Sequence, residues 1–373
     1  MILRRLLLLV VCISTLGGLS AQDLHYSLFN LAPLKLNPAN TGAFYGTVRA
    51  GGIFRDQWYS VLDDEYRTPT FSLDAPVIRG FRDSDWVGAG VLFVNDKVGS
   101  ANFRTSGVLM SASYHFALDK KANQTLTLGL QGGSMSRQLD LQTLIAGDFA
   151  QATLDGNANS QTTDPLLSGG GGMTGGGNDP NMGDLNTSYL DINAGLLYKA
   201  KDPKAGTLLE LGIALGHLTQ GNDSFRGGGT GGINNPPGGG NNNNDESQRP
   251  MSFLAHGRYV YPVNETWSAE PSFLFQTTRG GLNNIILQGV AGYQFNDQIK
   301  LKGGLGYRVG DAGQILLGAV IDETLEVGLS YDINLSQLSN VSNYQGGFEI
   351  GATYIIKIYK QPQIPPSILC PRL

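Results

Sequence analysis

Four histidines are the side chains best suited to acid–base chemistry in this chain: His25, His115, His217 and His256. A hydrolase would need one of them beside a serine or cysteine nucleophile, with a third group that orients the ring. His217 in "LGHLTQG" and His256 in "FLAHGRYVY" have no such motif nearby, and neither HExxH nor CxxC occurs. We therefore expect no enzyme activity, no catalytic residue, no metal site and no cofactor. A hydrolase that uses one of the four histidines is the weakest of three functional hypotheses.

Two glycine-rich stretches are further candidates for ligand binding, "SGGGGMTGGGNDPNMGD" and "RGGGTGGINNPPGGGNNNN". A phosphate loop needs a following Lys-Ser or Lys-Thr on a helix, and neither stretch has one. Residues 178–184, "NDPNMGD", are rich in oxygen ligands but lack the closing Glu and the spacing of a calcium loop. Both stretches are too poor in apolar residues to fold alone, so we interpret them as flexible external loops.

The amino terminus has the layout of a secretory signal peptide over residues 1–21. Arg4 and Arg5 precede an apolar run, and small residues end at Ala21. The mature chain then begins near Gln22. Cys12 lacks the small preceding residue of a lipoprotein cleavage site, so a lipid anchor is not expected.

The composition indicates neither an ordinary soluble core nor a nucleic-acid partner. Charged residues make up 15% of the chain, whereas soluble domains average about 25%. A net charge of -5 offers no attraction for nucleic acid. No 18-residue apolar stretch follows the signal peptide, which excludes a helical membrane protein. Cys370 is the only cysteine of the mature chain, so no internal disulfide can stabilise the fold.

Apolar side chains occupy every second position in segment after segment, which indicates strands with one apolar and one polar face. In "TLEVGLSYDINL" the apolar residues from Leu325 to Leu335 alternate with polar or small ones. "TLLELGIALG" and "IKLKGGLGYRV" have the same period of two. Such strands belong either to a soluble sandwich or to a membrane barrel, which differ in strand length and turn asymmetry.

The loop lengths favour an all-β fold, a transmembrane antiparallel outer-membrane β-barrel of about fourteen strands. With the amino terminus in the periplasm, the periplasmic turns are short, as in "YPVNE" and "FNDQ". The extracellular loops then include the two longest connections, near 137–186 and 219–249. The strands are expected to begin near Phe44, Tyr66, Asp85, Asn102, Gln124, Thr187, Gly206, Pro250, Glu265, Gly281, Asp297, Ala312, Thr324 and Gly346.

Aromatic residues near the strand ends fit membrane-interface girdles, and the alternative is packing inside a sandwich. They are Trp58, Tyr59, Trp86, Tyr198, Tyr259, Tyr261, Trp267, Tyr293 and Tyr359. The interior faces are expected to carry charges of both signs, which can line a pore or pair into a filled lumen. We favour a partly filled lumen; these residues are Glu210, Lys300, Lys302, Arg308, Glu326, Asp332, Glu349 and Lys357.

Eight stretches, in order along the mature chain, resemble the PorP/SprF family of outer-membrane proteins of the type IX secretion system of Bacteroidetes. They are "QDLHYSLF", "LNPANTGAF", "FRDQW", "TPTFSLDAPV", "GAGVLFVNDKVG", "YDINLSQLS", "GGFEIGATY" and "CPRL". Each is weak alone, but the ordered set is specific. The two Gly/Asn-rich loops and a tail without an aromatic after its Arg depart from the family.

The resemblance implies a non-enzymatic barrel that works with the secretion and gliding machinery. Its partners would be periplasmic ring or peptidoglycan-linked proteins of the type IX system and a secreted adhesin-like protein at the cell surface, within outer-membrane lipid. The barrel would support secretion or surface retention of that adhesin. The alternative from another class is an outer-membrane transporter for hydrophobic substrates or small solutes, with an amino-terminal plug and an apolar pocket.

The resemblance and the residues together give a set of partner-binding or structural candidates. They are Asn37, Pro38, Asn40, Gly42, Arg55, Asp56, Trp58, Cys370, Pro371 and Arg372. Pro38 biases Asn37 towards an extended backbone. "LNPANTG" then either plugs the lumen, its Asn side chains bonded to inward charges, or meets a ring protein at the periplasmic mouth. We favour the plug. Cys370 either pairs with a partner thiol or stays free.

Four parts of the chain follow from these expectations. The signal peptide covers 1–21, and a periplasmic amino-terminal segment that can form a plug covers 22–43. The barrel covers 44–359. A periplasmic tail, 360–373, either docks on a ring protein or is disordered, since its prolines forbid a helix.

Overall fold

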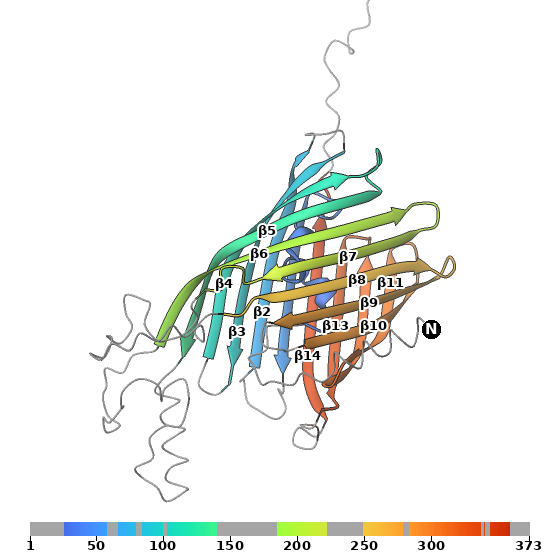
Figure 1. The fold of residues 1–373 in the computed structure, drawn as a ribbon. Helices are drawn as coiled ribbons and strands as arrows, with labels where there is room; N and C mark the ends of the chain where they lie inside the picture. Colours follow the sequence, from blue (N-terminus) through green and yellow to red (C-terminus); the bar gives the residue numbers. More distant parts are fainter. Residues whose placement is uncertain are drawn as a thin grey trace, which may run out of the picture.

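The strands close into one antiparallel barrel. The computed structural model describes residues 26–57, 66–79, 84–99, 103–139, 185–221, 249–278, 283–336, 339 and 344–358. Neighbouring strands are consecutive in sequence, and β1 also pairs with β14 to close the barrel (Figure 1). The expectation of an all-β barrel is therefore confirmed. The strands are β1 (Val48–Gln57), β2 (Tyr66–Arg79), β3 (Trp86–Val98), β4 (Phe103–Ala117), β5 (Gln124–Leu139), β6 (Leu185–Asp202), β7 (Thr207–Gly216), β8 (Ser252–Pro262), β9 (Trp267–Thr278), β10 (Asn283–Gln294), β11 (Ile299–Arg308), β12 (Ala312–Ile321), β13 (Leu325–Asn334) and β14 (Gln345–Ile356).

The alternating pattern places the apolar side chains outside the barrel and the polar ones inside. On β7, Leu211, Ile213 and Leu215 are exposed on the outer face, whereas Glu210 points inward to charged partners on β6 and β8. A soluble sandwich would show the reverse arrangement. The outer wall is therefore suited to lipid. None of the helices in the described residues is long and apolar enough to cross a membrane.

The two ends of the barrel differ in the length of their connections. We call the end that carries the β5–β6 and β7–β8 connections the loop end, and the opposite end the turn end. The connections at the turn end are all short, as the β6–β7 turn at 203–206 illustrates. Tyr261, Trp267 and Tyr293 are exposed on strands near the turn end, where the girdle was predicted.

Two of the sequence predictions are wrong in detail. β1 begins at Val48 rather than near Phe44, because residues 44–47 still bend out of the lumen after Gly42, whose φ of 67° lies in the region that glycine favours. Trp86 is not a girdle residue. Its indole stacks on His115, with the ring centroids 4.4 Å apart, and donates a hydrogen bond to the carbonyl of Gly42 inside the barrel.

Candidate functional site

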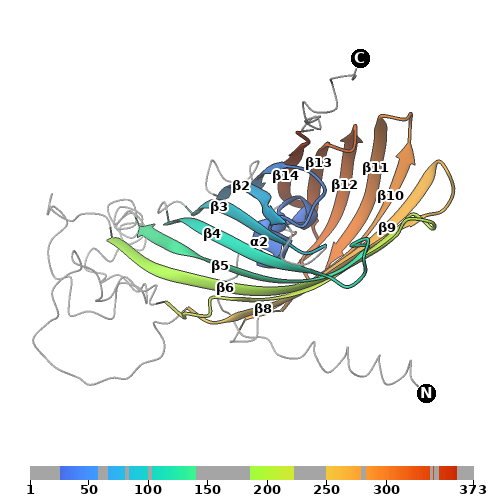
Figure 2. The same ribbon diagram turned by 90° about the horizontal axis from the view of Figure 1, so that it is seen from above.

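Residues 26–43, which we call the plug, lie inside the ring of strands (Figure 2). The plug contains two short 3-10 helices, η1 (Phe29–Leu31) and η2 (Pro38–Asn40), and one α-helical turn, α2 (Pro33–Leu36). Prolines open α2 and η2, where the missing N–H of proline costs no helical hydrogen bond. The plug begins in the half of the lumen nearer the loop end and descends to the turn end, where it leads into β1.

Apolar side chains of the plug pack on apolar patches of the inner wall. Leu34 is 0% exposed and packs with side chains of β3 to β6, and Phe29 and Leu36 pack on β8 to β10. Tyr26 packs on Ile53 of β1. Burial raises the pKa of the Tyr26 phenol, so its hydroxyl stays neutral and bonds to Thr70.

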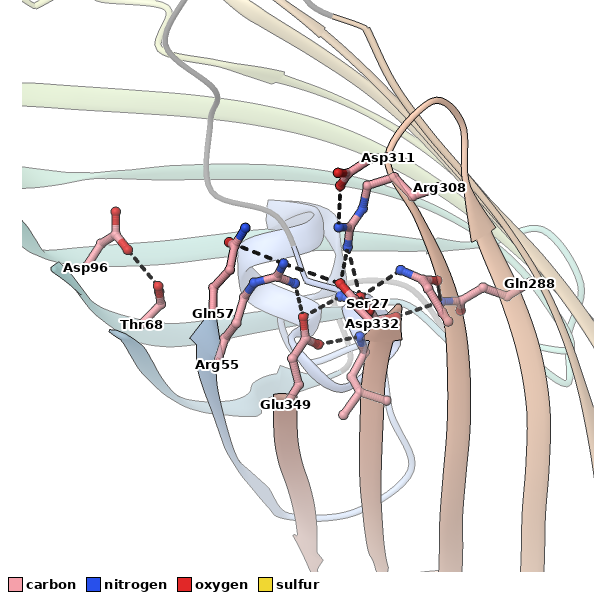
Figure 3. A network of polar contacts seen from close by, with 12 residues as sticks. Ser27, Arg55, Gln57, Thr68, Asp96, Gln288, Arg308, Asp311, Asp332 and Glu349 are labelled. Carbon is pink, nitrogen blue, oxygen red and sulfur yellow. Dashed lines mark hydrogen bonds and ion pairs between the residues drawn. The ribbon is translucent and has the colours of Figure 1, made fainter. Parts of the chain in front are cut away.

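The first polar anchor of the plug is Ser27, which is surrounded by buried charged and amide groups (Figure 3). Its backbone N–H donates to Glu349 at 2.8 Å, and its hydroxyl donates to Asp332 at 2.7 Å. Arg308 donates to the same hydroxyl at 2.8 Å, and Gln288 donates to the Ser27 carbonyl at 2.7 Å. Every polar atom of this one serine is thus bound to the wall.

Arg55 joins the two carboxylates of this anchor from the side of β1. Its guanidinium pairs with Glu349 and lies 3.3 Å from Asp332, which also accepts from Arg308 at 3.1 Å. Arg308 also pairs with the half-exposed Asp311 at 2.9 Å, so the buried part of the network holds two arginines and two carboxylates. This network ties β1, β11, β13 and β14 to the start of the plug.

The second anchor is Asn37, in the middle of the plug. Its side-chain amide donates to the backbone carbonyls of Leu196 and Ile213, at 3.1 Å each, and lies 3.2 Å from His256. A Cβ atom at Gly195 or Gly212 would overlap the Asn37 side chain, so only glycine lets the amide reach the wall backbone. The proposed partners of this asparagine were inward charges, and the observed ones are main-chain carbonyls.

The third anchor lies at the turn end. The Thr41 carbonyl accepts from Ser113 at 2.5 Å and lies 2.9 Å from Nε2 of His115, and the Thr41 hydroxyl donates to Ser111 at 2.9 Å. The backbone N–H of Gly42 donates to Asp74 at 2.7 Å. The plug is therefore fixed at both of its ends and in its middle.

The remaining inward charges form paired networks on β6 to β13. Glu210 pairs with Lys199 at 2.6 Å and with Arg258 at 3.0 Å. Glu270 pairs with Lys300 at 2.7 Å, and Lys302 bridges Glu270 and Glu326 at 3.2 and 2.7 Å. These ion pairs agree with the prediction that Glu210, Lys300, Lys302 and Glu326 face the lumen.

The candidate residues fall into three groups. Asn37, Pro38, Asn40 and Gly42 lie in the plug, where the Asn40 side chain donates to the Pro33 carbonyl. Arg55 belongs to the Ser27 anchor, whereas the neighbouring Asp56 pairs with Arg67 at 3.1 Å. Trp58, Cys370, Pro371 and Arg372 lie outside the described residues, as do the signal peptide and the tail.

Sequence reasoning missed Ser27 as an anchor. It placed Glu349 and Asp332 on the inner face but gave them no partner. The available signal was "QDLHYSLF", one of the stretches that carry the family resemblance. Inward carboxylates on two adjacent strands also required cations or N–H donors.

The geometry around His115 does not form a catalytic triad. Ser113 Oγ lies 2.9 Å from His115 Nε2, as in a nucleophile–base pair, but both atoms contact the Thr41 carbonyl. Nδ1 of His115 faces the Thr127 hydroxyl at 2.8 Å rather than a carboxylate. In the described part of the chain, no group of three or more His, Cys, Asp or Glu residues could hold a metal ion.

The family of type IX secretion system membrane proteins PorP/SprF matches residues 18–354. The chain belongs to this family. It is an outer-membrane β-barrel of the PorP/SprF type, and the family does not point to catalysis. Membership also implies partners from the type IX system. No protein with a curated description matches this PorP/SprF chain.

Several solved barrels are similar to this PorP/SprF protein at low identity. The toluene transporter TodX of Pseudomonas putida is 12% identical, with 91% of this chain and 95% of that chain covered and a TM-score of 0.43. A FadL homologue of Pseudomonas aeruginosa is 14% identical, with 85% and 92% covered and a TM-score of 0.38. The KdgM porin is 8% identical, with 82% and 98% covered and a TM-score of 0.31. These likenesses say nothing about what the chain binds.

Proposed function

We propose that this barrel is a non-enzymatic interaction protein of the type IX system that supports secretion or surface retention of an adhesin-like partner. The observation that carries the proposal is the plug. A lumen occupied by a segment with three buried polar anchors suits a protein that works through its surfaces. Family membership supplies the secretion system in which those surfaces act.

The loop end is our proposed contact for the secreted partner. The two longest connections, 140–184 and 217–251, both join strands at this end, and long loops face the outside in barrels of the outer membrane. The turn end then faces the periplasm. This orientation also requires export by a cleaved signal peptide over 1–21, which we keep as part of the proposal.

The tail is our proposed contact for a periplasmic ring or peptidoglycan-linked protein. β14 ends at Ile356 on the turn end, so residues 360–373 start on the proposed periplasmic side. The candidates there are Cys370, Pro371 and Arg372. If the tail is disordered and has no partner, its removal should leave secretion and surface display unchanged.

The transporter alternative for hydrophobic substrates is less well supported by the lumen. A cavity of about 480 Å³ opens between the plug and the wall towards the loop end. Its lining carries the charged side chains Lys35, Arg55, Asp96, Asp191 and Arg249 among apolar ones such as Val94, Phe103 and Leu109. An apolar ligand would have to remove water from these charged groups, so our proposal does not include hydrophobic transport.

Deletion of the gene tests the proposed function. We expect the deletion strain to lose secretion or surface display of at least one type IX substrate, and the full chain supplied in trans to restore it. A chain that ends at residue 359 separates the tail from the barrel. If a substrate is lost, purification of the intact membrane complex identifies the partner. Unchanged secretion and display of all type IX substrates in the deletion strain would contradict the proposal.

A further inference from the structure

The polar inner face of the barrel is interrupted on three adjacent strands. Leu254 on β8, Leu274 on β9 and Ile286 on β10 all point inward, and the register pairs Leu274 directly with Ile286. On each strand, the inward-facing residues two positions before and two positions after them are polar. These are Ser252, His256, Ser272, Gln276, Asn284 and Gln288.

The plug covers this apolar patch with two side chains. Phe29 of η1 and Leu36 of α2 pack on Leu274 and Ile286, and Ile286 is 0% exposed. We call these four side chains, with Leu254, the seal. No hydrogen bond between side chains of the plug and the wall crosses the seal, because all of its members are hydrocarbon.

Two cavities whose linings combine apolar and charged side chains lie on opposite sides of the seal. The cavity of about 480 Å³ near the loop end is bordered by Leu36, Leu254 and Gln276. A smaller cavity of about 70 Å³, bordered by Ser27 and Gln288, continues along β8 to β13. Its lining carries charges of both signs, from Arg258, Glu270, Lys302 and Glu326. The seal is therefore an apolar contact between two cavities that each carry charged groups.

A short apolar constriction between polar compartments stops water and ions, and it conducts when it is opened or made polar. We propose that the lumen holds a closed aqueous pathway for small ions and other small hydrophilic solutes along β8 to β10, with the seal as its gate. The ligand class follows from the lining. Paired charges of both signs replace the hydration of small ions, whereas they offer nothing to an apolar solute.

The opposite face of the plug provides a matched control. Leu34 is as buried as the seal residues, but it packs on Leu92, Leu109 and other side chains of β3 to β6. Truncating Leu34 removes the same side-chain atoms as truncating Leu36, without touching the seal. A conductance that arises only from general loosening of the plug would follow both kinds of change.

The experiment measures the current through the purified full chain in planar bilayers in KCl. The variants are Phe29→Ala/Leu36→Ala on the plug, Leu274→Thr on the wall and Leu34→Ala as control, each checked for a heat-modifiable barrel on gels. We expect a silent wild type and control. Both seal variants should raise the mean current roughly tenfold or more above the wild type.

Three results would overturn the proposal. A wild type that already conducts at the level of the seal variants shows that no gate exists there. A Leu34→Ala current equal to that of the seal variants shows that the plug is loosened as a whole. A silent, folded Leu274→Thr barrel shows that the seal closes no pathway, even if the double plug variant does not fold. The pathway does not depend on the proposed secretion partner, so secretion results leave it unaffected.

Discussion

Asn37 of the plug donates its side-chain amide to the main-chain carbonyl of Leu196 on β6, at 3.1 Å. The same amide bonds the carbonyl of Ile213, the residue that the register pairs with Leu196. Wall carbonyls can be reached because the adjacent inward positions, Gly195 and Gly212, carry no side chain. A motif that looks like a loop in the sequence is therefore a buried joint between the plug and the barrel.

Removing the Asn37 amide should destabilise the barrel. Asn37→Ala leaves two carbonyls and His256 without this donor at a fully buried site, and we expect a loss of about 1–3 kcal/mol in the free energy of unfolding. Urea titration followed by heat-modifiable gel mobility measures it. Asn95→Ala on the exposed outer face of β3 is the control, expected within about 0.5 kcal/mol of the wild type. Equal losses in the two variants would refute the anchor.

Gly129, which lies against η2, should not accept a side chain. A Cβ atom at Gly129 would overlap the backbone of Ala39, whereas one at Gly303 on β11 meets nothing within 4 Å. We expect Gly129→Val to displace the plug and Gly303→Val to leave it in place. Maleimide labelling of Ala39→Cys in a Cys370→Ser background reports the difference. Slow labelling of both variants would show that the plug tolerates the added side chain.

Breaking the charged anchor should cost more than breaking an exposed ion pair. Arg55→Ala leaves Glu349 and Asp332 buried with less compensation, and we expect a loss of about 3–5 kcal/mol. Arg67→Ala removes an ion pair with Asp56 whose arginine is 43% exposed, and it should cost about 1 kcal/mol or less. Both losses come from the same urea titration. The order of the two losses is the test, and the reverse order is incompatible with the Ser27 anchor.

The outer wall should respond to charge according to depth. Leu130 is 62% exposed within β5, and Leu118 is 56% exposed in the turn after β4. In a bilayer we expect Leu130→Arg to cost about 2–4 kcal/mol and Leu118→Arg about 1 kcal/mol or less. Folding yields in vesicles at a series of urea concentrations provide the comparison. Similar costs at the two positions would place the hydrocarbon band elsewhere.

The fold was largely predictable because a strand with one apolar and one polar face shows a period of two without reference to any other strand. Most of the strand starts were found in this way. In the structure Trp86 shares the inward phase of β3 with Gly88 and Gly90, both of which face the plug. The sequence alone does not show which phase faces inward, and the preference of strand-end tryptophans for the membrane interface led to the wrong placement.

The site was predictable only in part. "LNPANTG" and Arg55 were singled out, but their partners depend on how the plug is placed against the wall. The contact between Ser27 and Glu349 spans 322 residues of sequence, and no local pattern encodes it. The same holds for Asn37, whose main-chain partners leave no trace in the side-chain sequence.

The central claim is that the barrel serves secretion through its surfaces while the plug stays in the lumen. Thr41 and Ser111, whose hydroxyl oxygens lie 2.9 Å apart, allow the plug to be locked. A Thr41→Cys/Ser111→Cys chain with Cys370→Ser should form a disulfide between plug and wall. Secretion and surface display of the partner substrate in a deletion strain carrying this chain should equal those of a strain carrying Cys370→Ser alone while the disulfide is intact. Loss of secretion that is restored by reduction would contradict the claim.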